Sequence, residues 1–118
     1  MMPEAMQAMV DRLAAGGVRA CTDERDLNPP AVLIRPPALS WQFGGCVSGD
    51  WTLLAAVPDT GTGPSLAALD ELITATQAAL GGEIVAGAPA ALRTSDSGSP
   101  LPAYRLTFTA DLVEGISR

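Results

Sequence analysis

The chain has 118 residues, enough for one domain with a buried core, and it carries a formal net charge of -6. All seven basic residues are arginines, and the sequence contains neither Lys nor His. This composition argues against hydrolytic, lyase and zinc chemistry, because it lacks the usual general base, the Schiff-base amine and the commonest metal ligand. The arginines are also scattered, whereas binding to nucleic acid needs clustered cations. We therefore predict a protein that is not an enzyme and that holds no cofactor or metal.

The cysteines and the N-terminal residues bear on the cellular compartment. Cys21 and Cys46 are interpreted as two reduced thiols, with a disulfide between them as the alternative. The N-terminal residues lack the pattern of a signal peptide, and no apolar run approaches the ~18 residues that a membrane span needs. We therefore expect the chain to be made and kept in a cytosol-like compartment, without membrane contact.

The first predicted element is a helix that begins near Pro3 and Glu4, two residues suited to a first helical turn. Gly16 and Gly17 end its pattern. Its apolar residues recur at spacings of three and four, and they are Met2, Met6, Met9, Val10 and Leu13. We interpret this methionine-rich face as core packing, with an adaptable contact to another chain as the alternative.

Two diprolines enclose a short hydrophobic segment further along the chain. Before them, residues 18–21 predict a brief strand and residues 22–26 a solvated charged loop. Proline donates no backbone hydrogen bond and disfavours helical geometry in the residue before it, so Pro29-Pro30 and Pro36-Pro37 exclude a helix. Residues 31–35 are therefore predicted to form a short strand whose ends the prolines fix.

A predicted hairpin follows the second diproline and carries three of the five aromatic residues. Bulky and small side chains alternate over residues 39–43, Gly44-Gly45 permits a tight reversal, and residues 46–57 form the second arm. We expect a kink or bulge at Gly49-Asp50. The bulky faces consist of Leu39, Trp41 and Phe43 on the first arm, and of Trp51, Leu53, Ala55 and Val57 on the second.

The aromatic residues of this hairpin are the candidate functional residues of the chain. We predict that Trp41, Phe43 and Trp51 contact another subunit or partner, because aromatic residues are enriched in protein contacts. The alternative is a core position, since alternation also fits an internal face.

The most clearly predicted helix spans residues 64–80 and ends at Gly81-Gly82. Its apolar stripe has helical spacing, and its solvent face is expected to present Asp70, Glu71 and Gln77. The early position of the two carboxylates suits the helix dipole.

The last third of the chain predicts a second hairpin. Residues 84–93, interrupted by Gly87 and Pro89, are followed by a polar loop at 94–100 and a cleanly alternating strand at 104–109. The whole chain, residues 1–118, is predicted to be a single α+β domain, a mainly antiparallel sheet with two helices packed on one face in the order α-β-β-β-α-β-β.

Four short motifs resemble functional sites, and each has a simpler interpretation. The acidic residues of 23–26 lack the glycine and terminal acid of an EF-hand, which leaves a solvated loop. Asp59-Thr60-Gly61 repeats the tripeptide of aspartic proteases, but no hydrophobic strand follows it, so we predict a turn. Residues 61–64 lack the lysine of a phosphate loop, and the serines of 95–99 have no base to activate them. None of these motifs is predicted to be catalytic.

The sequence around the diprolines resembles a family of phage proteins. The residues that carry the resemblance are Arg25-Asp26-Leu27-Asn28-Pro29-Pro30, Val32-Leu33-Ile34, Pro36-Pro37, residues 39–43 and Leu101-Pro102-Ala103-Tyr104-Arg105-Leu106-Thr107. On these residues the chain is similar to the tail-terminator, or tail-completion, proteins of long-tailed, siphovirus-type phages that infect actinobacteria. In element order the resemblance spans nearly the whole chain, and it departs from the family's pattern around residues 44–50.

The resemblance implies a structural virion protein of the tail neck, assembled in the host cytoplasm. It implies a hexameric ring that caps the head-proximal end of the tail tube, ends tube polymerisation and joins the tail to the head connector. The implied partners are further copies of the chain, the tail tube protein and the head-closure or connector protein. DNA would pass through the lumen without sequence-specific binding.

The formal charge agrees with this expectation. Six copies carry six times -6, or -36, and an acidic lumen would repel the DNA backbone. Two alternatives stay open: a head-closure or other head-to-tail connector component, and, from another class, a small cytosolic ligand-binding or enzymatic domain.

Overall fold

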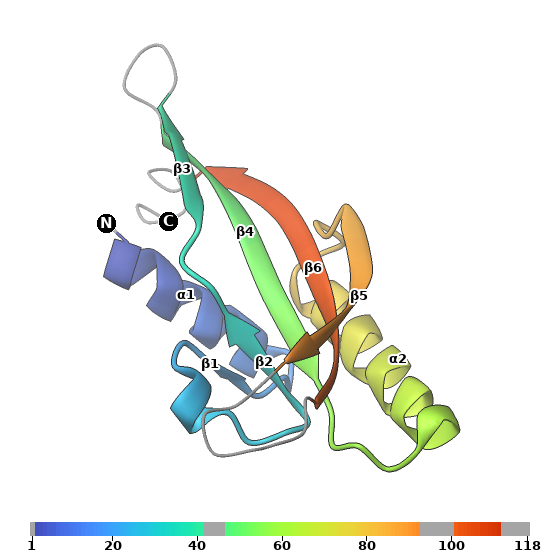
Figure 1. The fold of residues 1–118 in the computed structure, drawn as a ribbon. Coiled ribbons are helices and arrows are strands. Elements are labelled where there is room, and N and C mark those ends of the chain that lie inside the picture. Colours follow the sequence, from blue (N-terminus) through green and yellow to red (C-terminus); the bar gives the residue numbers. More distant parts are fainter. Residues whose placement is uncertain (1, 42–46, 93–100, 112–118) are drawn as a thin grey trace.

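A mixed sheet with two helices forms the body of the computed structural model, which describes residues 2–41, 47–92 and 101–111 (Figure 1). In chain order the elements are α1 (Met2–Ala15), β1 (Ala20–Cys21), the 3-10 helix η1 (Glu24–Asp26), β2 (Ala31–Ile34), β3 (Ala38–Trp41), β4 (Val47–Ala56), α2 (Thr62–Ala79), β5 (Ala86–Leu92) and β6 (Leu101–Asp111). The strand order is β1-β2-β4-β6-β5, with β3 also paired to β4. The pairing of β1 with β2 is parallel and the other pairings of the described strands are antiparallel. The predicted α+β class is confirmed, with one strand more before α2 than in the predicted order.

Pro36-Pro37 divides one edge of the sheet into the strands β2 and β3. Both pair with β4 on the same side, β2 along its second half and β3 along its first half. The Arg35 amide continues the β2 register by donating to the Thr52 carbonyl at 3.1 Å, whereas Ala38 already pairs with Asp50. The two prolines therefore face Trp51 alone, which makes a bulge of two residues against one. Proline suits this position because it has no N–H to leave unpaired.

This bulge lies on the strand opposite the one that the sequence predicted. β4 pairs with β6 without a break from Ser48 to Ala56, so Gly49 and Asp50 stay in register. The predicted kink or bulge at Gly49-Asp50 is wrong. The irregular backbone falls at the diproline because glycine and aspartate can complete a ladder and proline cannot.

The second hairpin is also more regular than predicted. β5 pairs with β6 continuously from Ala86 to Leu92, through both Gly87 and Pro89. The predicted interruption of this strand is therefore wrong. β5 is the outermost strand of the sheet, and an edge strand is where a sheet tolerates proline.

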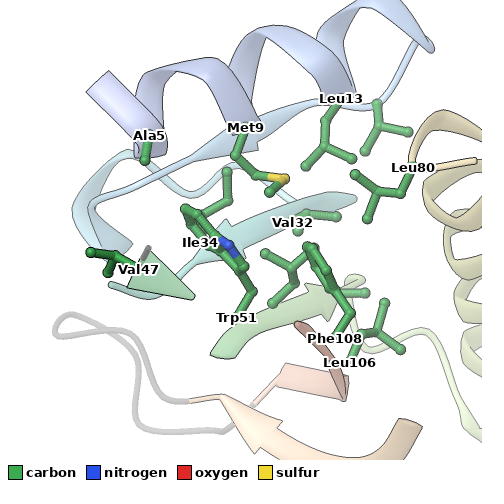
Figure 2. Packing of buried hydrophobic residues seen from close by; sticks show 13 residues of the cluster. Ala5, Met9, Leu13, Val32, Ile34, Val47, Trp51, Leu80, Leu106 and Phe108 are labelled. Carbon is green, nitrogen blue, oxygen red and sulfur yellow. The ribbon is translucent and has the colours of Figure 1, made fainter. Parts of the chain in front are cut away.

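Both helices cover the same face of the sheet, as predicted. Alternation along β4 and β6 directs Trp51, Leu53 and Phe108 to this face, where Met9 and Leu13 of α1 lie against them (Figure 2). A smaller buried group lies on the opposite face, which carries neither α1 nor α2, and consists of Leu33, Leu54, Ala56 and Ala103. We call this second side the helix-free face.

The two helices meet at their C-terminal ends. A Cβ atom added to Gly16 would lie 2.5 Å from the Cβ atom of Ala79, so a larger residue does not fit there. The Arg12 side chain donates to the Leu80 carbonyl at 2.8 Å and pairs with Glu83. That carbonyl belongs to the end of α2, where backbone oxygens lack helical partners, so Arg12 of α1 caps α2.

We predict that Gly16→Ala destabilises the protein by about 1–3 kcal/mol, because the added methyl group overlaps Ala79. Gly63→Ala is the matched control, since Gly63 lies in α2 with no atom within 4 Å of the added Cβ atom. We expect the control to be neutral or more stable by up to ~1 kcal/mol. Urea unfolding followed by circular dichroism measures both, and equal losses in the two variants would contradict the close approach of the helices.

Candidate functional site

The structure separates the aromatic residues that were predicted to form one contact surface. Trp41 ends β3, on an arm of β3 and β4 that extends away from both helices, and 68% of its surface is exposed (Figure 1). Trp51 is 2% exposed. Phe43 lies outside the described residues. Of the three, Trp41 is therefore the one that the structure places at a surface.

Trp51 is a core residue. Its ring stacks on Phe108, its register partner on β6, with ring centroids 6.3 Å apart and an angle of 11° between the rings. Its Nε1 atom is buried with no hydrogen-bond partner among the described residues, which costs about 1–3 kcal/mol, and burial of the large ring offsets this cost. The position of Trp51 corrects the expectation that it contacts a partner, and it is not proposed again for that role.

Trp41 lies at the end of β3, which among the described strands pairs with β4 alone. Two residues earlier on the same face of β3, Leu39 is half-buried and packs against the core. Trp41 pairs with Val47, which is buried, so the backbone at Trp41 is fixed while its ring is free. An exposed tryptophan whose backbone is held in a paired strand is typical of a protein contact.

A second apolar feature lies between α2 and the segment that leads into β5. It is a groove of about 480 Å³, lined by Ile73, Thr74, Gln77, Ala78, Gly81, Gly82 and Ile84. The Gln77 side chain holds one wall, because its amide accepts from the Ile84 N–H at 2.9 Å and donates to the Ile84 carbonyl at 3.1 Å. The sequence placed Gln77 on the solvent face of the helix, and the structure shows it half-buried instead. Sequence reasoning missed this groove, since its residues come from two elements with no shared motif.

The motif at residues 59–61 is a turn, as predicted. The Asp59 carboxylate accepts the Gly61 N–H at 3.2 Å, and the Ser65 hydroxyl accepts the Thr60 N–H at 3.1 Å. Ser65 also donates to the Pro58 carbonyl at 3.4 Å. These bonds hold the start of α2 against the end of β4.

The acidic segment at residues 23–26 is organised by an arginine. Arg25 pairs with the Asp23 carboxylate at 3.0 Å, and this contact lowers the pKa of Asp23 below its ordinary value. Within the described ranges, no three His, Cys, Asp or Glu side chains gather where they could hold a metal ion. The serines of 95–99 lie outside the described residues.

No protein-family model matches the chain, and no curated protein matches it either. The family is thus not assigned by these comparisons. In the part of the chain that the structure covers, the helices are too short or too polar to cross a bilayer.

We predict that Trp51→Ala destabilises the protein by about 3–5 kcal/mol, because it leaves a large cavity beside Phe108. Trp41→Ala is the control and should change stability by no more than ~0.5 kcal/mol, since its ring is exposed. Urea denaturation measures both. A similar loss in the two variants would show that Trp41 also belongs to the core.

Cys21 provides a test of burial on β1. It carries a free thiol and is half-buried against the helix-free face. Burial, followed by the nearby Asp26 carboxylate, raises the pKa of the Cys21 thiol above its ordinary value. Cys46 lies outside the described residues.

We predict that Cys21 reacts slowly with iodoacetamide, because a raised pKa lowers the thiolate fraction at a given pH. The Cys46→Ser variant isolates Cys21, and the pH profile of its alkylation should have its midpoint above that of the same chain unfolded in urea. Coincident folded and unfolded profiles would contradict the burial of this thiol.

Proposed function

We propose that this protein is a tail terminator, a structural virion protein whose copies form a ring on the head-proximal end of a phage tail tube. The ring ends tube polymerisation and joins the tail to the head connector. The proposal includes a hexamer, contacts with the tail tube protein and with the head-closure or connector protein, and no catalytic activity.

The observation that carries the proposal is the exposed Trp41 at the end of the β3–β4 arm. A tryptophan held 68% exposed on a paired strand suits a ring subunit, because Trp is enriched among the residues that dominate protein contacts. The resemblance around the diprolines adds to this, because Pro36-Pro37 separates the arm-forming strand β3 from β2.

The outer strands of the described sheet also suit a ring subunit. β5 lies at one side of the sheet, and β1 and β3 lie toward the other. Contacts between two different surfaces of identical subunits repeat from copy to copy and close into a ring when the rotation allows. A closed ring of this kind occupies the end of a tube and leaves no position for the next tube subunit.

The acidic charge of the chain supports passage of DNA through such a ring. A lumen lined by carboxylates repels phosphate groups, so the DNA slides without being held. The second candidate function is a small ligand-binding domain, and the apolar groove beside Gln77 favours it. A head-closure component is the alternative within the neck.

Native mass spectrometry and negative-stain imaging of the purified protein test the proposal. A hexamer has a mass of six times 12.1 kDa, which is 72.6 kDa, and should appear as closed rings. In the phage that encodes the chain, its loss should give tails of irregular length. Normal tails beside leaking heads would indicate a head-closure protein, and a monomer that binds a small ligand saturably would indicate the ligand-binding alternative.

We predict that Trp41→Ala weakens ring assembly while the subunit stays folded, because truncation of a central tryptophan in a contact costs about 2 kcal/mol or more. Trp41→Phe keeps an aromatic ring and should assemble better than the alanine variant. Sedimentation velocity over a concentration series measures the effect. Assembly of Trp41→Ala equal to that of the unmodified chain would remove Trp41 from the contact.

A further inference from the structure

The arginines of this acidic chain fall into two groups in the described residues. Arg12 caps α2 and pairs with Glu83, Arg19 donates to the Asn28 carbonyl at 3.0 Å, and Arg25 pairs with Asp23. Arg35 and Arg105 are exposed, and neither side chain makes a hydrogen bond or ion pair with the described residues. These two cations are therefore available for a contact outside the chain.

Both unpartnered arginines lie on the helix-free face. Arg105 pairs in register with Leu54, whose side chain belongs to the buried group on that side. Arg35 follows Leu33 by two residues and bonds Thr52 through its amide, which places its side chain on the same side. Thr52 pairs in register with Thr107, so these two threonines lie on the same face.

The surroundings of these arginines are open and offer little competing negative charge. A hollow of about 360 Å³ lies beside Arg35, with Leu33 and Pro36 in its lining. Asp23 also lines the hollow, but Arg25 already engages its carboxylate. Asp50, further along the same face, accepts the Thr109 hydroxyl at 2.8 Å. The helix-free face therefore presents cations that no side chain of the described molecule neutralises.

The outer surface of α2 has the opposite charge. Its charged residues are Asp70 and Glu71, both exposed, and its sequence contains no cation. Leu66 lies one turn before Asp70 and is 53% exposed. The two carboxylates are opposite in charge to the guanidinium groups of Arg35 and Arg105.

We propose that Arg35 and Arg105 on the helix-free face receive the outer surface of α2, with Asp70 and Glu71, from a second copy of this chain. The contact rests on the proposed ring and names the surfaces through which neighbouring copies meet. Because α2 covers the opposite side of the sheet, one copy cannot use both surfaces toward the same neighbour. The contact is therefore head-to-tail, and it repeats around a ring. It also removes the unpartnered cations from contact with solvent or DNA.

Charge reversal on each surface tests this contact. The Arg35→Glu/Arg105→Glu variant and the Asp70→Arg/Glu71→Arg variant should each fold, since all four side chains are exposed. Each alone faces like charges across the contact, so the concentration for half-assembly should rise ~10-fold or more. An equimolar mixture of the two should assemble again, because an alternating ring restores opposite charges at every contact. Sedimentation velocity and native mass spectrometry measure assembly, and circular dichroism checks folding.

The control is Arg19→Glu, compared with Arg35→Glu alone; both make the same change in net charge, and the Arg19 side chain already has a partner within the chain. Arg19→Glu should assemble as the unmodified protein does. Unchanged assembly of Arg35→Glu/Arg105→Glu, or failure of the mixture to recover, would overturn the contact while leaving ring formation intact. An unmodified chain that stays monomeric would instead reject the proposed function and the contact with it.

The same variants distinguish a subunit contact from a surface that binds nucleic acid. Binding of a short fluorescent duplex DNA to the purified protein is followed by anisotropy. We expect no difference between the unmodified chain and Arg35→Glu/Arg105→Glu. Loss of DNA binding without loss of assembly would assign the arginines to nucleic acid and overturn the proposal.

Discussion

The packing of Trp51 is the constraint on which the rest of the molecule depends. Its ring fills the space between the sheet and α1, stacked on Phe108, and on the other side of its strand the two prolines of the bulge face it. This one residue thus lies where β4 meets β6, where α1 covers the sheet and where the edge divides into β2 and β3. The order of the layers follows from burying a side chain of this size in a small core.

The separation of β2 from β3 at Pro36-Pro37 links the fold to the proposed function. A continuous strand in place of β2 and β3 would follow β4 in a single register along its length. The bulge at Pro36-Pro37 shifts the pairing by one residue and leaves β3 with β4 as an arm beyond the helices. Trp41 is exposed at the end of that arm. A single backbone irregularity therefore produces both a closed core and an apolar contact point.

The two sides of the sheet have different chemistry, and the difference has a physical basis. On the side of the helices, burial excludes charge, and the residues there are apolar. On the helix-free face, charged side chains can remain solvated, and the Arg35 and Arg105 side chains lie there without partners among the described residues. In a chain of net charge -6, copies that approach each other at random repel. Two unpaired cations on one face give such copies a preferred direction of approach.

Local sequence rules were enough to predict both helices and most strands. The signals they use affect the backbone only within a few residues, and they are the hydrophobic periodicity, Gly16-Gly17, Gly81-Gly82 and the diprolines. They could not predict the position of the bulge, the regular pairing of Pro89 or the burial of Gln77, because these depend on which strand or segment lies alongside. The same limit applies to the site. Alternation predicts the same environment for Trp41 and Trp51, and only the tertiary packing makes one exposed and the other buried. The sequence by itself determined the class of fold, the presence of both helices and the absence of His and Lys. The tertiary structure decided which side chains are free for contact, because exposure is a property of neighbours that lie far apart in the chain.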